Sequence, residues 1–124
     1  MKKEDTMPKY VLLLHDAPDA YRGLSPEQMQ QVIQKYVAWG DGLRNAGVLE
    51  GGQKLADEPG RILKGRNGQV RVTDGPYSET KEVLGGYYIV AAGSYDQAVD
   101  LARSCPHFEF GGTIEVREID SMGE

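Results

Sequence analysis

The sequence has little of what marks an exported or membrane-bound protein. Its one cysteine, Cys105, excludes a disulfide within the chain. No apolar run approaches the ~20 residues that a membrane-spanning helix requires. The first residues, Met1 to Thr6, are polar and lack the apolar centre of a signal peptide. We therefore expect a cytoplasmic protein that has no contact with membranes.

Several common catalytic and cofactor motifs are also missing. There is no glycine-rich phosphate loop, no dinucleotide fingerprint and no nucleophilic-serine motif. His15, His107 and Cys105 do not have the spacing of a metal-binding motif. The net charge is −5 and the basic residues are scattered, which argues against a nucleic-acid partner. We expect no metal, no cofactor and no nucleic acid.

The length and composition predict a single globular domain. A chain of 124 residues has the size of one domain, and 40% hydrophobic with 27% charged residues is ordinary for a folded chain. We expect a flexible polar segment over residues 1–8 and one domain over residues 9–120.

The apolar pattern and the turn signals predict six strands and two helices. Ser25, Pro26 and Gln28 form the start of a helix with a capping box, and Asn67-Gly68 is a strong hairpin signal. The predicted order is a strand at Tyr10–Leu14, a helix from Ser25 to Gly47, strands at Val48–Leu55, Arg61–Arg66, Gln69–Thr73 and Leu84–Ala92, a helix from Ser94 to Pro106, and a strand at Thr113–Ile119. This order is α+β, a ferredoxin-like βαββαβ fold with an inserted hairpin.

The first strand predicts a homodimer. Val11 and Leu13 are apolar as well as Leu12, while two helices cover only one face of a sheet. On the last strand, Glu115 and Arg117 should point away from the helices, because side chains alternate along a strand. We expect two sheets to pack face to face around a polar-lined cavity.

The most distinctive stretch runs from Thr73 to Tyr88. Asp74-Gly75-Pro76-Tyr77, Glu79-Thr80-Lys81-Glu82 and Gly85-Gly86-Tyr87-Tyr88 resemble the DGPF-type branch of the YCII-related family, with Tyr77 in place of the usual Phe. Trp39, Ala46-Gly47-Val48-Leu49, Cys105-Pro106 and Ile114-Glu115-Val116-Arg117 also fit that family, over roughly residues 10 to 119.

The resemblance implies a dimeric α–β barrel whose activity is mostly unassigned. Relatives in the wider YCII group include an enzyme that removes chloride from a hydroxylated aromatic ring, with a His-Asp dyad whose His lies on the first helix. The first helix here contains no His, so that dyad does not carry over. DGPF-type proteins also occur beside extracytoplasmic-function sigma factors, which implies a link to transcription.

Two residues are candidates for acid–base catalysis, Asp74 in the turn and His15 at the end of the first strand. Asp74 has an alternative role as a turn residue, and His15 as an ordinary strand residue that is not partnered by Asp16. The candidate ligand-binding residues are Lys81, Glu79, Tyr77, Arg71, Arg117 and Tyr87, although Lys81 and Glu79 also fit a solvated surface pair.

Two further residues have structural interpretations. We expect Cys105 to be a small core residue, and His107 to be structural or exposed. Three function classes remain: a cofactor-independent acid–base enzyme acting on a small cyclic or aromatic molecule, a non-catalytic ligand-binding or regulatory protein linked to sigma-factor-dependent transcription, and a structural partner of a transcription factor. Whether the protein is an enzyme stays open at this point.

Overall fold

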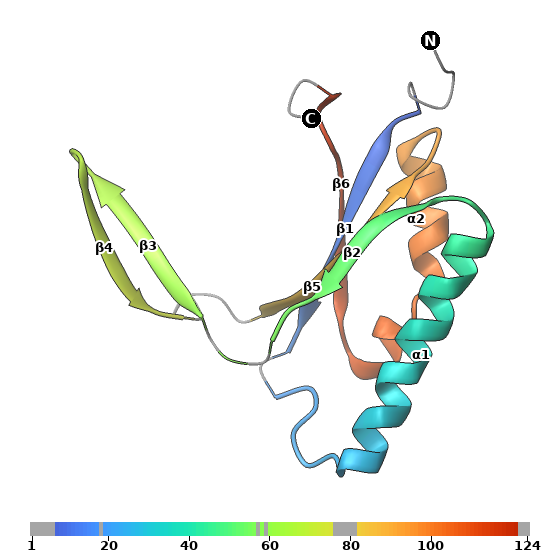
Figure 1. Ribbon diagram of the computed structural model, residues 1–124, viewed down its shortest axis with the longest axis horizontal. Coiled ribbons are helices and arrows are strands. Elements are labelled where there is room, and N and C mark those ends of the chain that lie inside the picture. Colours follow the sequence, from blue (N-terminus) through green and yellow to red (C-terminus); the bar gives the residue numbers. More distant parts are fainter. Residues whose placement is uncertain (1–6, 18, 57, 59, 76–81, 122–124) are drawn as a thin grey trace.

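The computed structural model describes residues 7–17, 19–56, 58, 60–75 and 82–121. It contains a four-stranded sheet, two α-helices on one face of that sheet, and a separate two-stranded hairpin (Figure 1). The elements in chain order are β1 (Lys9–Asp16), α1 (Pro26–Asn45), β2 (Leu49–Lys54), β3 (Arg61–Arg66), β4 (Gln69–Asp74), β5 (Val83–Ala91), α2 (Tyr95–Arg103), the 3₁₀ helix η2 (Pro106–Phe110) and β6 (Thr113–Glu118).

The main sheet has the strand order β2-β5-β1-β6. Both β1 and β2 are antiparallel to β5, so they are parallel to each other with β5 inserted between them, and α1 connects them. This is the split βαβ arrangement. The predicted α+β, ferredoxin-like fold is therefore confirmed.

Both helices begin where their capping residues predict. The Ser25 hydroxyl accepts a hydrogen bond from the Gln28 amide, and the Gln28 side chain accepts one from the Ser25 amide. Ser94 likewise accepts from the amide of Gln97 at the start of α2. These bonds satisfy amide groups that have no partner within the first turn of a helix.

The core lies between the helices and one face of β1. Tyr10, Leu12 and Leu14 are buried there, and Cys105 joins the same cluster as expected. Ile114 and Val116 of β6 pack against this cluster, in the orientation that the alternation predicted. The core therefore takes its side chains from alternate positions of the central strands.

The other face of the sheet is called the open face here. It presents the alternate residues Val11 and Leu13, with Tyr87, Ile89, Glu115 and Arg117 beside them in the strand register. No described helix covers this face (Figure 1). The predicted homodimer depends on the half-buried apolar residues at the centre of this face.

Strands β3 and β4 form a hairpin that we call the arm, residues 61–74. Its turn has Asn67 at φ 54° and Gly68 at φ 82°, the left-handed pair that a tight two-residue hairpin requires. The arm is a sheet of its own and extends from the main sheet on the side opposite the helices (Figure 1). The inserted hairpin is thus confirmed.

One helical element was not predicted. Pro106 does follow the end of α2, at Arg103, but it also begins η2, because proline suits the first position of a helix. No helix within the described ranges is long and apolar enough to cross a membrane.

Candidate functional site

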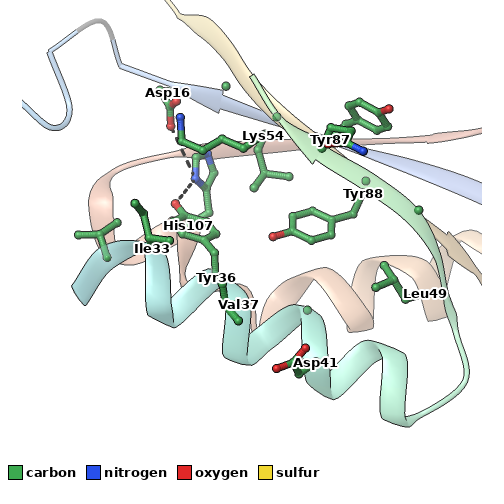
Figure 2. A pocket seen from close by; sticks show the side chains of 18 of the residues that line it. Asp16, Ile33, Tyr36, Val37, Asp41, Leu49, Lys54, Tyr87, Tyr88 and His107 are labelled. Atoms are coloured by element: carbon green, nitrogen blue, oxygen red, sulfur yellow. Dashed lines mark hydrogen bonds and ion pairs between the residues drawn. The ribbon is translucent and has the colours of Figure 1, made fainter. Parts of the chain in front are cut away.

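A pocket of about 440 Å³ opens between α1 and the sheet at β2 and β5 (Figure 2). It lies on the helical face of the sheet, whereas the sequence had predicted a cavity on the open face. Its volume is within the range of small-molecule sites. The pocket is therefore the main candidate site within the described chain.

The pocket is hollow because glycines form its floor. A Cβ atom at Gly52 would lie 2.7 Å from the Tyr87 carbonyl oxygen, and one at Gly86 would lie 2.9 Å from that of Gln53. Both positions line the pocket, and larger residues there would collide with the neighbouring strand. The floor is consequently bare backbone where side chains would otherwise fill the space beneath α1.

The walls of the pocket are apolar and aromatic. Helix α1 contributes Met29, Ile33 and Val37, and Val37 is 56% exposed despite facing the pocket. Across from the helix, the Tyr88 ring points toward α1 and contacts Trp39 edge to face at a centroid distance of 4.9 Å (Figure 2). The resulting space is bounded by an aliphatic helix face, an aromatic ring and flat backbone.

Four polar side chains meet at one end of the pocket. Tyr21 lies with its hydroxyl 3.3 Å from Asp16 Oδ1 and 3.1 Å from the Tyr36 hydroxyl. The Tyr36 hydroxyl lies 2.8 Å from Nδ1 of His107, and the same nitrogen is 3.8 Å from Asp16 Oδ1. Figure 2 shows Asp16, Tyr36 and His107 together at this end. We call these four residues the polar cluster.

The tautomer of His107 follows from its contacts. Its Nε2 lies 2.8 Å from the backbone carbonyl oxygen of His15, which can only accept a hydrogen bond, so Nε2 carries a proton. Nδ1 then accepts from Tyr36 when the imidazole is neutral and donates to Tyr36 when it is charged. His107 can therefore gain or lose a proton at Nδ1 without losing either partner.

Burial holds Tyr36 in its neutral form. Loss of contact with water, followed by the hydrogen bond with Tyr21, raises the pKa of the Tyr36 phenol far above its ordinary value. The neutral Tyr36 hydroxyl therefore connects Tyr21 to His107 through one hydrogen bond on each side. The carboxylate of Asp16 is its more exposed neighbour, at 22% of the side chain against 2% for His107.

Phe110 supports the cluster from behind. Its ring lies 6.0 Å from those of Tyr21 and Tyr36, and it belongs to the same 3₁₀ helix as His107. An ion pair of 2.6 Å between Lys35 and Glu109 links α1 to that helix. The short helix therefore holds the imidazole against α1.

Comparison with known proteins agrees with this architecture. The family described as YCII-related domain matches residues 8–122. The chain belongs to the YCII-related family. It is also 30% identical over 112 residues to an uncharacterized protein of Rhizobium meliloti (strain 1021), covering 89% of this chain and 90% of that protein. The DGPF-type assignment within the family stays a prediction.

This YCII-related protein has a His-Asp pair that sequence reasoning missed. The first helix contains no His, but η2 supplies His107 and the end of β1 supplies Asp16. We expected His107 to be either structural or exposed. It is only 1% exposed, and it also lines the pocket. No local motif connects the two, because they are separated by most of the chain. The sequence signals in this region were Cys105-Pro106 and His107 itself, and neither indicates a contact with Asp16.

The predicted catalytic residue Asp74 lies away from this pocket. It is the last residue of β4, its side chain is 88% exposed, and its carboxylate is 3.7 Å from Nε of Arg61. From the sequence, Lys81 or an arginine such as Arg71 is expected near Asp74, and the arginine that the structure places there is Arg61. Arg71 is three residues away on the same strand and so points to the opposite face of the arm. A catalytic role for Asp74 stays a prediction.

His15, the second predicted catalytic residue, points to the open face. Its Nε2 lies 3.3 Å from Glu115 Oε1, and Asp16 is not its partner, as expected from strand alternation. Arg117 lies on the same face opposite Val11. His15 enters the polar cluster only through its backbone carbonyl oxygen.

The remaining predicted ligand-binding residues are divided. Tyr87 borders the pocket, with its ring on the other side of β5 from Tyr88 (Figure 2). Tyr77, Glu79 and Lys81 lie outside the described residues. Among the residues described, no group of three or more His, Cys, Asp or Glu side chains is arranged to hold a metal ion.

Proposed function

We propose that the pocket is the active site of a cofactor-independent acid–base enzyme that acts on a small, planar, hydroxylated ring. The observation that carries this proposal is the polar cluster at one end of a pocket whose walls are mainly apolar and aromatic. A carboxylate, two phenols and an imidazole in continuous hydrogen-bond contact are suited to accepting and returning a proton. The proposed proton transfer uses only side chains of this chain.

The proposed chemistry begins at Asp16, whose side chain is more exposed than that of His107 at the other end of the cluster. Its carboxylate accepts the proton of a ring hydroxyl as the ring changes toward its keto form. The proton then moves through the hydroxyls of Tyr21 and Tyr36 to Nδ1 of His107, each oxygen releasing one proton as it receives another. Asp16 is thereby ionised again, and the reverse path returns a proton to the ring.

The shape and charge of the pocket support this substrate class. A planar ring fits between the backbone floor and the aliphatic face formed by Ile33 and Val37. Lys54 also lines the pocket, and a cation near a ring oxygen stabilises the negative charge that develops there. The resemblance to the YCII-related family, whose wider group includes an enzyme acting on a hydroxylated aromatic ring, supports the same class.

The test is exchange of ring hydrogen for deuterium in D₂O, followed by NMR on a panel of di- and trihydroxybenzenes. We expect wild-type protein to accelerate exchange on at least one ring. Asp16→Asn should reduce the rate by about 10²-fold or more. Asp74→Asn is the matched control, since it removes the same charge at an exposed position outside the pocket.

The outcomes of this test separate the candidate residues. If Asp74→Asn abolishes exchange while Asp16→Asn does not, the site lies at the arm and the proposal for the pocket is wrong. If rings bind in the pocket without any exchange, the alternative function is favoured, a non-catalytic ligand-binding or regulatory protein linked to sigma-factor-dependent transcription.

We also propose that the protein works in the cytoplasm as a homodimer joined through the open face. Val11, Leu13 and Ile89 give that face an apolar centre. Glu115 and Arg117 flank it two residues apart, so two copies related by a two-fold axis can pair unlike charges. The free, buried thiol of Cys105 supports a reducing compartment.

A further inference from the structure

The arm has one apolar face that no other described residue covers. Leu63 pairs with Val72 and Gly65 with Val70, so these side chains share a face. Leu63, Val70 and Val72 are 62%, 63% and 57% exposed. A two-stranded hairpin alone in water is only marginally stable, so an arm with this composition needs a surface to pack on.

The direction and length of the arm point to a neighbouring molecule. The arm leaves the main sheet on the side opposite the helices, which is the side of the open face (Figure 1). Six extended residues span about 20 Å. A globular domain of this size has a radius of gyration of roughly 14 Å. The arm is therefore long enough to lie along a second domain placed on the open face.

The charge of the arm favours a second copy of this chain as that neighbour. Residues 61–74 contain four basic side chains and one acidic one, a net charge of +3. Since the whole chain has −5, the rest of it carries −8. The basic residues Lys64, Arg66 and Arg71 lie on the face opposite the apolar one. They therefore stay in solvent when the apolar face packs, and the opposite net charges of arm and body still favour the approach of two copies.

We infer that the arm is a clasp that packs the apolar face formed by Leu63, Val70 and Val72 onto a second copy of this chain. This inference rests on the proposed homodimer and adds the arm to its interface. Each subunit of a two-fold dimer would contribute one arm, so the contact occurs twice. The pocket belongs to a single chain and is independent of it.

Two neighbouring residues on β4 give a matched test. Val72→Glu and Thr73→Glu add the same charge at exposed positions on opposite faces of the arm. By sedimentation equilibrium we expect a dimer for the wild type, a dimer Kd weakened at least about tenfold for Val72→Glu, and a change within about twofold for Thr73→Glu. Amide exchange in residues 61–74 should also slow as the wild-type concentration rises through Kd.

The opposite results would overturn the inference. Equal Kd values for the two variants, or arm amides that exchange equally fast in monomer and dimer, mean that the arm lies free. A wild-type protein that is a monomer and whose arm binds vesicles of anionic phospholipid would also overturn the inference. Leu13→Glu separates the underlying dimer proposal: if it leaves the dimer intact while Val72→Glu disrupts it, the clasp stands and docking through the open face is wrong. Ring exchange by dilute Val72→Glu protein tests the pocket separately.

Discussion

The hydroxyl of Tyr36 lies 2.8 Å from Nδ1 of His107, although 71 positions separate the two residues in the chain. This contact joins α1 to the 3₁₀ helix that follows α2. It also fixes the direction in which the imidazole can exchange a proton, because the other ring nitrogen is committed to a backbone carbonyl oxygen.

Tyr36→Phe tests the contact. The change keeps the ring and removes the hydroxyl, which leaves Nδ1 of a buried imidazole without its nearest partner. We expect the free energy of unfolding to fall by about 1–3 kcal/mol and ring exchange to be lost. Urea denaturation and the deuterium assay measure the two effects.

Tyr21→Phe is the control for that variant. It removes a hydroxyl from the same cluster but leaves the contact between Tyr36 and His107 in place. A smaller loss of stability with an equal loss of exchange would support the proton path. Full exchange activity in both variants would show that the two phenol hydroxyls do not transfer protons between Asp16 and His107.

Gly85→Ala tests whether space beside the carboxylate matters. A Cβ atom at Gly85 would overlap Oδ2 of Asp16, so the carboxylate must move out of its position. We expect ring exchange to fall by about tenfold or more with the fold retained, as judged by circular dichroism. Gly65→Ala in the arm is the matched strand control, because a Cβ there meets only ordinary contacts at 3.5 Å or more. Unchanged exchange in Gly85→Ala would contradict the assignment of Asp16.

The stability of the protein should decline in alkaline solution. Burial raises the pKa of the Cys105 thiol from 9.0 to about 11, and it raises the pKa of Tyr36 as well. Between pH 9 and 11 the unfolded chain therefore loses protons that the folded chain keeps, which favours unfolding. We expect the free energy of unfolding to be constant below pH 9 as far as these groups are concerned and to fall above it.

Urea denaturation from pH 7.5 to 10.5 measures this decline, and Cys105→Ala should reduce its slope. The same burial predicts slow reaction of native Cys105 with a disulfide reagent at pH 8 and fast reaction after unfolding. A native thiol that reacts at the rate of a free cysteine would contradict the assigned burial.

The sequence predicted the fold because its signals are local. Ser25 and Gln28 identify the start of α1, and Asn67-Gly68 identifies the arm, each through neighbours within a few residues. The site could not be predicted in the same way. Asp16 and His107 come together only through the packing of β1 against η2. The sequence alone does not distinguish a buried His from an exposed one.

There is also a physical reason why the predicted residue Asp74 lies away from the pocket. Asp74 lies next to a turn rich in polar residues, which predicts a site there, but strand pairing in the arm places it opposite Arg61, in solvent. The sequence identifies Gly85-Gly86 as part of a family motif but does not indicate that Gly86 forms the floor of a pocket. That role depends on which face each glycine occupies, and the register irregularity after Leu14 determines it.

The bare floor has a consequence for how this pocket can change. Gly52 and Gly86 admit no side chain, so substitutions there alter the fold before they alter the ligand. Ile33 and Val37 of α1 are exposed enough to be exchanged without opening the core. For the proposed ring-binding site, changes in size and substitution preference should therefore arise more readily on the helix side than on the glycine floor.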